Sequence, residues 1–264
     1  MNKKDKKPKV SIIIVNYNNA RYLDNCINSV LNQSYKNKEI IVVDDKSEDN
    51  SIDVLKRFKN KIKVIKNQRK TSNGSYNQIN SCYKGFIKSK GEYLFFLDSD
   101  DYFQKKKIEL VINEFKLKKK LNLIFDLPIL KYENKEIKKK FVQKKFIISS
   151  WPRFSPQSCI SIKKKFATEV FKVLKINRFE TIWFDFRLAV YYFLQNKNIH
   201  ILKKYLTYYR QLDHSASKKY KFLNKNWWYR RKQAHEFVSF INKKLKQKDS
   251  TNVDKILTKI MNSF

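Results

Sequence analysis

The sequence predicts an α/β protein with a mostly parallel central sheet, and three observations support this class. Short apolar runs alternate with segments of helical periodicity over residues 10–115, which is the pattern of repeated β-α-β units. These runs are continuously apolar, as expected of strands that helices cover on both faces. Acidic residues cluster where two of the runs end, at Asp44 and Asp45 and again from Asp98 to Asp101.

The first two strand and helix pairs follow in order from the N-terminus. The run VSIIIV, residues 10–15, is the first strand, and the helix behind it is marked by apolar residues at helical spacing: Leu23, Cys26, Ile27, Val30 and Leu31. The run EIIVVDD, residues 39–45, is the second strand, and the second helix is marked by Val54, Leu55 and Phe58. Each helix therefore has one apolar face with which to cover the sheet.

The next two pairs repeat this pattern. The run IKVIK, residues 62–66, predicts a third strand, and residues 75–89 predict a helix that ends near Gly91. The run EYLFFLD, residues 92–98, predicts a fourth strand, and the helix after it is marked by Ile108, Val111, Ile112 and Phe115. A sheet of such strands is expected to be buried.

The pattern loosens in the second half of the chain. Between residue 121 and about residue 180, prolines and lysine runs break the apolar pieces, which indicates shorter, partly antiparallel strands and loops. A helix is expected at 181–195. Two amphipathic helices flanked by basic residues are expected in the tail, with their apolar faces formed by Phe237, Val238, Ile241 and Leu245 and by Val253, Ile256, Leu257 and Ile260.

Composition narrows the range of functions. The formal net charge is +35, which favours anionic partners such as phosphates, acidic lipid or nucleic acid, although lysines on solvated helix faces explain part of it. The three cysteines form no close pair and no metal-ligand spacing, so neither a disulfide scaffold nor a zinc module is expected. A location in the reducing cytoplasm fits this pattern. No apolar stretch reaches the length of a membrane span, so any membrane contact is expected to be peripheral.

The two acidic strand ends indicate a ligand site. Ligands of open parallel sheets bind outside the carboxyl ends of the strands, which is where these acids lie. Asp at a strand-to-helix turn often caps the helix, but capping accounts for one acid per turn and not for two or three. Clustered carboxylates repel one another, and a divalent cation with oxygen ligands, Mg²⁺ or Mn²⁺, would relieve the repulsion and bridge to phosphate oxygens. With only three glycines, neither a P-loop nor a GxGxxG fingerprint can be written.

Three segments in this order resemble the GT-A fold glycosyltransferases of family 2: VSIIIVNYNNARYLDNCINSVLNQSY, EIIVVDDKSEDNS and KGEYLFFLDSDDYF. The resemblance is close over residues 9–115 and weak over 150–215. It implies a GT-A (Rossmann-like) sheet flanked by helices, with a C-terminal helical extension. It also implies a nucleotide-sugar donor, a divalent metal and inversion at the anomeric carbon.

The resemblance divides the chain into three regions. Residues 1–8 would be a basic N-terminal tail, residues 9–216 the GT-A domain, and residues 217–264 a basic amphipathic helical tail. Within the domain, residues 9–115 would form the nucleotide-sugar-binding half and residues 116–216 the acceptor-side half.

The resemblance also implies roles for individual residues. Asp45 would hydrogen-bond the nucleotide base, and the rest of the nucleotide-sugar pocket would be formed by Asn16, Tyr17, Asn18, Asp44, Asp98 and Ser99. Asp98 would face the ribose or the metal, and Asp100 would be the principal metal ligand. Asp101 would either join this site or cap the following helix. The family's Arg-Asn pair is absent, because Cys82 and Tyr83 stand in its place.

The catalytic base of the family lies in a Glu-Asp pair near the start of a late helix. The matching segment is FETIWFDFRLAVYYF, where Thr181 replaces the expected Asp and the carboxylates of Glu180 and Asp185 remain. Asp185 stands among aromatic residues, and desolvation there would raise its proton affinity, so we favour it over Glu180 as base. The alternative is a structural ion pair between Asp185 and Arg187 or a lysine.

The second half offers further candidates. SPQSCISI, residues 155–162, resembles the family's acceptor-side segment and supplies Gln157 and Ser158, and Trp151 would stack on a sugar or pack in the core. YYRQLDHSAS would end the catalytic domain, with His214 near the metal or in a structural role. Trp227, Trp228 and the basic residues after them suit either an anionic bilayer surface or packing on the domain.

We therefore expect a cytoplasmic glycosyltransferase, peripheral at the inner face of the cell membrane if its acceptor is a lipid-linked saccharide, and otherwise acting on a glycan. Two alternatives are kept from the same residues. A nucleic-acid-binding protein would explain the charge, but the acid clusters would sit badly on a phosphate backbone. A nucleotidyltransferase would use similar carboxylates on an α/β sheet. The residues themselves do not predict the sugar, the base of the donor, the acceptor or the oligomeric state, and the resemblance implies a UDP-sugar as the default donor.

Overall fold

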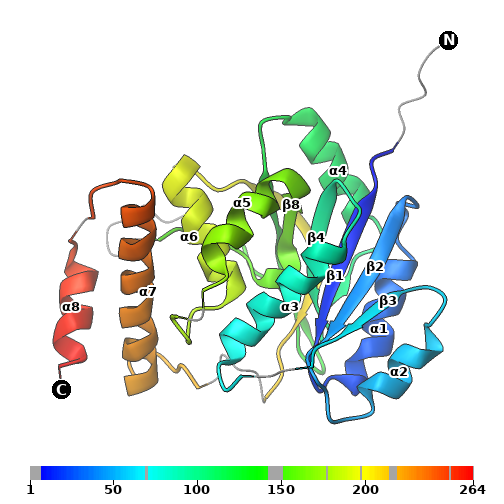
Figure 1. The fold of residues 1–264 in the computed structure, drawn as a ribbon, viewed down its shortest axis with the longest axis horizontal. Helices are drawn as coiled ribbons and strands as arrows, with labels where there is room; N and C mark the ends of the chain where they lie inside the picture. The colour runs from blue at the N-terminus through cyan, green and yellow to red at the C-terminus, as the bar shows by residue number, and fades with distance from the viewer. Residues whose placement is uncertain are drawn as a thin grey trace.

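One sheet organises the molecule, and helices cover both of its faces (Figure 1). The computed structural model describes residues 7–68, 71–141, 151–176, 178–196, 198–213, 219–249 and 251–263. Within these residues the sheet has nine strands in the order β3-β2-β1-β4-β8-β6-β9-β5, and β7 pairs with β6. None of the helices in the described ranges is long and apolar enough to cross a lipid bilayer.

The strands are β1 Val10–Asn16, β2 Lys38–Asp44, β3 Lys63–Lys66, β4 Tyr93–Asp98, β5 Tyr102–Phe103, β6 Leu123–Lys131, β7 Glu136–Lys138, β8 Ile160–Lys163 and β9 Ile201–Arg210. The first four pair in parallel, and β8 is antiparallel to both β4 and β6. Strand β6 therefore runs in the same direction as β4, and β9 pairs with it in parallel. The carboxyl ends of β1, β2 and β4 meet at one edge of the sheet.

The helices are α1 Ala20–Leu31, α2 Ser51–Arg57, α3 Gly74–Lys88, α4 Lys107–Leu117, α5 Lys164–Leu174, α6 Phe184–Asn196, α7 Lys225–Lys244 and α8 Val253–Met261. Successive residues of β1 face opposite layers: Ile13 packs in the core with α3, α5, α6 and α7, whereas Ile12 and Ile14 pack in the core with α1, α2 and α4. Two buried faces explain why the strands read as continuous apolar runs.

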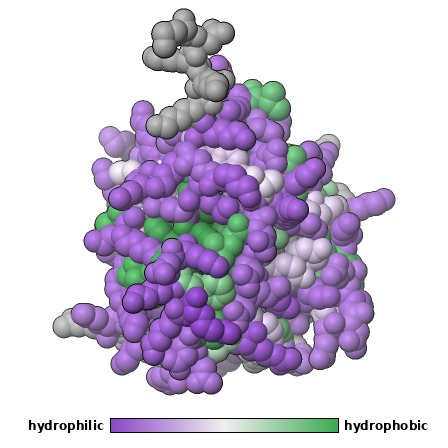
Figure 2. All heavy atoms as spheres, turned by 90° about the vertical axis from the view of Figure 1, so that its right-hand side faces the viewer, coloured by the Kyte–Doolittle hydropathy of each residue, from purple (hydrophilic) through white to green (hydrophobic). Residues whose placement is uncertain are grey.

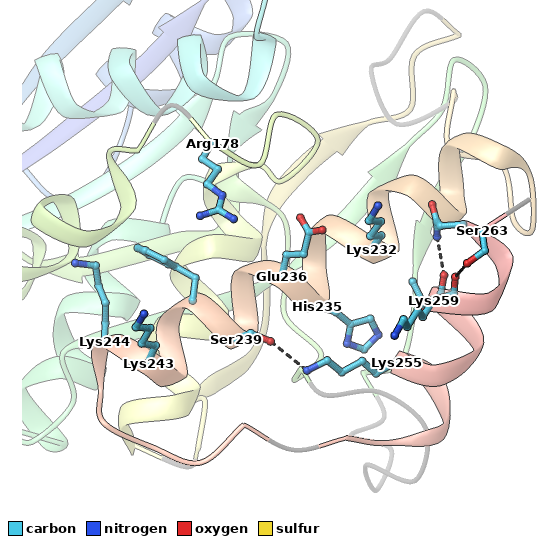
Figure 3. Close-up of a pocket in the computed structure, with 13 residues that line it drawn as sticks. Arg178, Lys232, His235, Glu236, Ser239, Lys243, Lys244, Lys255, Lys259 and Ser263 are labelled. Carbon is cyan, nitrogen blue, oxygen red and sulfur yellow. Dashed lines mark hydrogen bonds between the residues drawn. The ribbon is translucent and has the colours of Figure 1, made fainter.

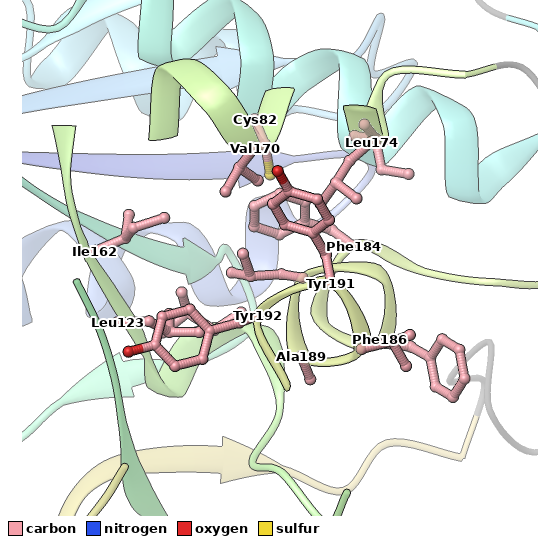
Figure 4. Packing of buried hydrophobic residues seen from close by; sticks show 14 of the residues in the cluster. Cys82, Leu123, Ile162, Val170, Leu174, Phe184, Phe186, Ala189, Tyr191 and Tyr192 are labelled. Carbon is pink, nitrogen blue, oxygen red and sulfur yellow. The ribbon is translucent and has the colours of Figure 1, made fainter. Parts of the chain in front are cut away.

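Helix α6 lies in the middle of the first of these cores. Figure 4 shows its Phe184, Tyr191 and Tyr192 among side chains from β6, β8, α3 and α5. The face that carries the β3 edge of the sheet is mostly hydrophilic, with a limited hydrophobic area near its middle (Figure 2). Much of the chain's excess of lysine is accordingly accommodated at the surface.

Helix α3 approaches β1 closely because residue 85 has no side chain. A Cβ atom on Gly85 would lie 2.4 Å from Cγ2 of Ile13, closer than any carbon contact allows. This glycine therefore lets α3 pack directly on the strand that leads to the acidic edge.

The α/β class and the first four strand and helix pairs are confirmed, with boundaries shifted by a few residues. The antiparallel strands expected between residue 121 and about residue 180 are β7, which pairs with β6, and β8, which pairs with β4 and β6. Helix α5 and strand β9 were not predicted, and the helix expected at 181–195 begins later, at Phe184. Residues 142–150, which contain part of the expected loop region, lie outside the described residues.

The tail contributes to the core of the domain. The apolar face predicted for it lies on α7, whose Ala234, Phe237, Val238 and Ile241 belong to the same buried cluster as α6. Trp227 and Trp228 are half-buried and contact each other edge to face at 4.7 Å. Of the two roles expected for this segment, the described contacts of α7 match packing on the domain.

A buried ion pair ties the second half of the sheet to α4. The ammonium group of Lys107 lies 2.8 Å from a carboxylate oxygen of Asp126 on β6, and both side chains are fully buried. Lys107 also donates to the carbonyl of Ser158 and to the hydroxyl of Thr207, each at 2.6 Å. Burial raises the pKa of Asp126, although Lys107 and Thr207 act in the opposite direction. The pair fixes β6, β9 and the turn at Ser158 around one cation.

We predict that Lys107→Met lowers the free energy of unfolding by about 3–5 kcal/mol, because it leaves the Asp126 carboxylate buried without its partner. Urea denaturation measures the change. The control is Lys105→Met, an exposed lysine two positions earlier, which should change stability by less than about 0.5 kcal/mol. Equal stability of the two variants would contradict the prediction, and Lys107→Met/Asp126→Leu should recover part of the loss.

Candidate active site

The strand register brings the predicted acidic residues to one edge of the sheet. Asn16 at the end of β1 is opposite Asp44 at the end of β2, and Val15 is opposite Asp98 at the end of β4. Asp45 and Ser99 follow directly, and their backbone N–H groups donate to the carbonyls of Asn16 and Val15 at 2.8 and 3.0 Å. The loops after β1, β2 and β4 therefore converge where an open parallel sheet binds ligands.

Asp44 organises the loops that follow β1 and β2. It is buried and accepts hydrogen bonds from the Asn16 amide at 2.8 Å and from the Ser47 hydroxyl at 2.6 Å. Asn18 adopts a left-handed conformation, with φ of 51°, and its side-chain oxygen accepts from the backbone of Glu48 at 2.8 Å. Tyr17 beside it is 40% exposed. Asp44 and Asn18 thus hold the loops that follow β1 and β2, and Tyr17 remains partly exposed beside them.

Asp45 is held by a residue that the sequence reasoning did not identify. Its carboxylate accepts a hydrogen bond of 2.6 Å from the amide of Asn67, which follows β3 and also donates to Ser81. The side-chain oxygens of Asn67 and Asn16 are buried and have no hydrogen-bond partner among the described residues. Because a buried acceptor without a donor costs about 1–3 kcal/mol, these two oxygens are suited to accept from a bound ligand.

Asp101 has a structural position. It is 1% exposed, and its two oxygens accept from the hydroxyl of Ser158 at 2.5 Å and from the backbone N–H of Arg210 at 2.8 Å. These bonds join β4 to the 3-10 turn Gln157–Cys159 and to the end of β9. The alternative that Asp101 caps the following helix is wrong, because α4 begins only at Lys107 and the N-cap, Lys106, makes no side-chain capping bond.

Asp98 and Asp100 are half-buried beside it. Asp98 accepts a hydrogen bond of 2.5 Å from the amide of Gln157 and another from Gln78. Burial raises the pKa of Asp98, and the charges of Asp100 and Asp185 raise it further. Burial and the charges of Asp100 and Asp98 likewise raise the pKa of Asp101. Burial and the mutual repulsion of the carboxylates together outweigh the hydrogen bonds, which act in the opposite direction.

A divalent cation fits this edge only together with ligand oxygens. The described residues contain no group of three or more His, Cys, Asp or Glu side chains placed to hold a metal. Asp101 already uses both oxygens, which leaves Asp98 and Asp100 as the carboxylates for a cation that takes its remaining ligands from phosphate and water. His214, the other expected ligand, lies outside the described residues.

Asp185 faces the acidic edge from the first turn of α6. Its charge contributes to the raised pKa values of Asp98 and Cys82, which places it close to both. Burial raises the pKa of Asp185 itself, while the N–H of Phe186, which donates at 2.7 Å, and the charge of Arg230 on α7 oppose the shift. No ion pair between Asp185 and Arg187 forms, since the Arg187 guanidinium donates to the carbonyls that precede α6.

Glu180 occupies a different environment. It is exposed, and its carboxylate accepts a hydrogen bond of 3.0 Å from the hydroxyl of Tyr229 on α7. Thr181, at the position where the family pattern expects Asp, is buried and bonded to the side chain of Gln233 at 2.8 Å. Of the two carboxylates, the structure therefore brings Asp185 to the acidic edge.

Tyr209 is a site residue that the sequence reasoning missed. Burial raises the pKa of its hydroxyl, and the four nearby carboxylates raise it further: Asp101, Asp98, Asp185 and Asp100. A phenol in this position stays protonated at neutral pH and can donate a hydrogen bond. It is the penultimate residue of β9, so a prediction of that strand from LTYY would have brought Tyr209 to the site.

Two of the expected acceptor-side residues, Gln157 and Ser158, form hydrogen bonds with the acids at the end of β4. Gln157 donates to Asp98, and the Ser158 hydroxyl accepts from the backbone N–H of Asp98 at 3.0 Å while donating to Asp101. Trp151 packs edge to face on Phe186 at 5.4 Å and on His235 at 4.9 Å, between α6 and α7. These are the contacts expected of the packing role of Trp151.

Comparison with known proteins adds a family to this geometry. The model of glycosyl transferase family 2 matches residues 11–183. An uncharacterised glycosyltransferase of Nostoc sp. is 37% identical over 133 residues, which are 49% of this chain and 39% of the relative. The poly(ribitol-phosphate) β-N-acetylglucosaminyltransferase TarP of Staphylococcus aureus is 37% identical over 109 residues, 40% of this chain and 32% of TarP.

A solved structure, S. aureus TarS 1-349 in complex with UDP-GlcNAc, has a similar fold. Its TM-score is 0.64 at 16% identity, and the superposition covers 96% of this chain and 70% of TarS 1-349. At this identity the likeness concerns the fold alone. The sequence matches to the two relatives span less than half of the length of either.

We predict that Mn²⁺ together with UDP raises the midpoint of thermal unfolding, because a cation bound at Asp100 relieves the repulsion among the acids. At a hundred times the dissociation constant, binding adds about 2.7 kcal/mol to stability. Differential scanning calorimetry with and without Mn²⁺ measures the shift. Asp100→Asn should lose it, whereas the control Asp53→Asn, an exposed acid on α2, should keep it. An equal shift in both variants would place the cation elsewhere.

Proposed function

The chain belongs to glycosyltransferase family 2, and from this premise we propose that it transfers a sugar from a nucleotide-diphosphate donor to a hydroxyl group of a glycan or lipid-linked acceptor, with inversion at the anomeric carbon. The observation that carries the proposal is the edge where β1, β2 and β4 end, because it combines buried polar side chains, paired carboxylates and a separate carboxylate on α6. Each of these parts has a task in sugar transfer.

The nucleotide of the donor is proposed to bind between the ends of β1, β2 and β3. The carboxylate of Asp45 would accept from the base, and the unpartnered oxygens of Asn16 and Asn67 would accept from further donor groups of the nucleotide. Asp44 and Asn18 hold the loops in place, and the hydroxyl of Ser99, next to Asp98 in the chain, accepts from the amide of Asn19 at 3.0 Å. A uridine nucleotide is the proposed donor, by analogy with the UDP-GlcNAc bound to TarS.

The diphosphate is proposed to bind beside Asp98 and Asp100. These two carboxylates would hold Mg²⁺ or Mn²⁺, and His214 is kept as a further proposed ligand. When bound, the cation offsets the negative charge that develops on the leaving diphosphate. The Tyr209 hydroxyl, whose pKa burial and these acids raise, is proposed to donate to a phosphate oxygen.

Asp185 is the proposed base. In an inverting transfer the acceptor hydroxyl attacks the anomeric carbon opposite the leaving group, and its proton must go to a nearby base. Asp185 is half-buried and has a raised pKa, so its carboxylate binds a proton more strongly than an exposed aspartate does. The charge of Arg230 opposes the rise in the pKa of Asp185 without cancelling it.

An anionic glycan is the proposed acceptor class. TarP and a relative from Bacillus spizizenii, 40% identical over 98 residues, are both named for transfer to poly(ribitol-phosphate). A net charge of +35 would attract such a polymer. A nucleic-acid-binding protein would also suit the charge, but it would leave the acidic edge and the family match without a role.

We predict that Asp185→Asn lowers kcat by about 10²–10⁴-fold while sparing donor binding, because the amide cannot take the proton. Asp100→Ala should abolish turnover. A panel of nucleotide sugars with and without Mn²⁺, read as release of nucleotide diphosphate, measures both. Glu180→Gln is the matched control and should retain turnover. Normal turnover in Asp185→Asn with loss in Glu180→Gln would assign the base to Glu180.

We also predict that kcat/KM falls on acidification with an apparent pKa above 3.8, the ordinary value for aspartate, because burial raises the pKa of Asp185 and only its ionised form accepts the proton. Arg230 faces Asp185 from α7, and Asp98 faces it from β4. Arg230→Leu removes the positive charge that lowers the pKa of Asp185, so the fall of kcat/KM on acidification should occur at higher pH. An unchanged pH profile in this variant would show that a group other than Asp185 titrates.

A further inference from the structure

Helix α8 presents its apolar side to solvent. Its apolar residues are exposed by 64%, 51%, 47%, 48% and 46%, in the order Val253, Ile256, Leu257, Ile260 and Met261. The residues that it buries are polar, Asp254 at 4% and Thr258 at 2%. An amphipathic helix of a soluble domain normally buries its apolar stripe, so the orientation of α8 is the reverse of the usual one.

Specific polar contacts fix this orientation. The carboxylate of Asp254 pairs with Arg231 and, at 3.0 Å, with the imidazole of His235, both on α7. At the other end of α8, the amide of Asn262 donates to the carbonyl of Trp228 at 3.1 Å. Asn252 caps the first turn by accepting from the backbone of Lys255. Helix α8 is therefore docked through its polar side along the length of α7.

A basic cavity lies next to the apolar face. It has a volume of about 960 Å³, lies between α7 and α8, and is open to solvent (Figure 3). Six cationic side chains line it, against one acid, Glu236: Arg178, Lys232, Lys243, Lys244, Lys255 and Lys259. Lys255 is paired with Asp249 at 2.6 Å, and the described residues show no ion pair for the other five. The cavity is therefore suited to anionic groups.

Cationic and apolar surfaces meet along α8. Lys255 and Lys259 are one helical turn apart and border the apolar stripe that contains Ile256 and Ile260. At the end where α8 approaches Trp228, Phe222 is 75% exposed and contacts the ring of Trp227. An apolar face bordered by lysines is the composition of helices that lie in the interface of an anionic bilayer.

We propose that the α7–α8 hairpin binds the surface of an anionic phospholipid bilayer. The apolar side chains of α8 enter the boundary between headgroups and acyl chains, and headgroup phosphates occupy the lysine-lined cavity. Charge complementarity selects this occupant, because a second copy of the chain would bring a further charge of +35 against the same cations. A soluble polyanion would leave the apolar face of α8 exposed. The attachment goes beyond the proposed reaction and does not depend on it.

Sedimentation of the full chain with vesicles tests the proposal. The protein should pellet with vesicles of phosphatidylcholine and phosphatidylglycerol and should remain in solution with phosphatidylcholine alone, and added salt should release it. Ile256→Ser/Ile260→Ser should lower the partition coefficient at least about tenfold. The control is Ile87→Ser/Leu117→Ser, which removes two apolar side chains from α3 and α4 that are at least as exposed as the two isoleucines, and it should bind like the native chain.

Substitutions of lysines that line the cavity test its part in the binding. Lys243→Gln/Lys244→Gln should lower binding about fivefold for each lysine, whereas Lys59→Gln/Lys61→Gln, a pair beyond α2, should have a smaller effect. Equal losses in both pairs, or native binding by the Ile256→Ser/Ile260→Ser variant, would overturn the proposal. So would a thermal shift with glycerol phosphate but no pelleting, or a dimer that the isoleucine variant dissociates. Nucleotide release with a soluble acceptor should be unchanged in all of these variants, so failure of the attachment and failure of the reaction are separable.

Discussion

The repulsion among the carboxylates at the end of β4 is the constraint on which the arrangement of the site depends. Because burial and neighbouring charges raise the pKa of Asp98 and Asp101 above their values in the unfolded chain, these groups favour the folded state only at low pH. That contribution is lost as the pH rises through the raised pKa values. At neutral pH the edge therefore costs stability, and the ion pair of Lys107 and Asp126, the turn at Ser158 and the end of β9 hold it in place.

Features of the fold and the site that depend on a local sequence pattern could be predicted, whereas those that depend on contacts between distant residues could not. The first four strands and the acids at their ends could be predicted, because a buried parallel strand is a local pattern and its last residue lies at the carboxyl edge wherever the strand pairs. Strand β9 was missed because its exposed Lys203 and Lys204 interrupt the apolar run, and Tyr209 was missed with it. The bonds of Asp101 to Ser158 and Arg210 join residues far apart in sequence, which no local pattern records.

Helix α7 contacts the residues at which this chain departs from the family pattern, and it also contributes to the rest of the site. Where the family has Asp, Thr181 is bonded to Gln233, and Glu180 beside it is bonded to Tyr229, so α7 holds both residues of the expected pair. The same helix places Arg230 near Asp185 and pairs with α8 through Arg231 and His235. A segment that reads as a basic tail is thus part of the environment of the proposed base.

The net positive charge of the chain and the acidic edge of the sheet act on anions in opposite ways. A chain with a net charge of +35 attracts anions over its whole surface, but acids at one edge would repel the diphosphate of a donor. The proposed cation at Asp98 and Asp100 would reverse the sign of that edge locally without changing the surface elsewhere. The cavity lined by the lysines of α7 and α8 contains none of the acids at the end of β4. The proposed donor site and the proposed membrane surface therefore share no lining residue.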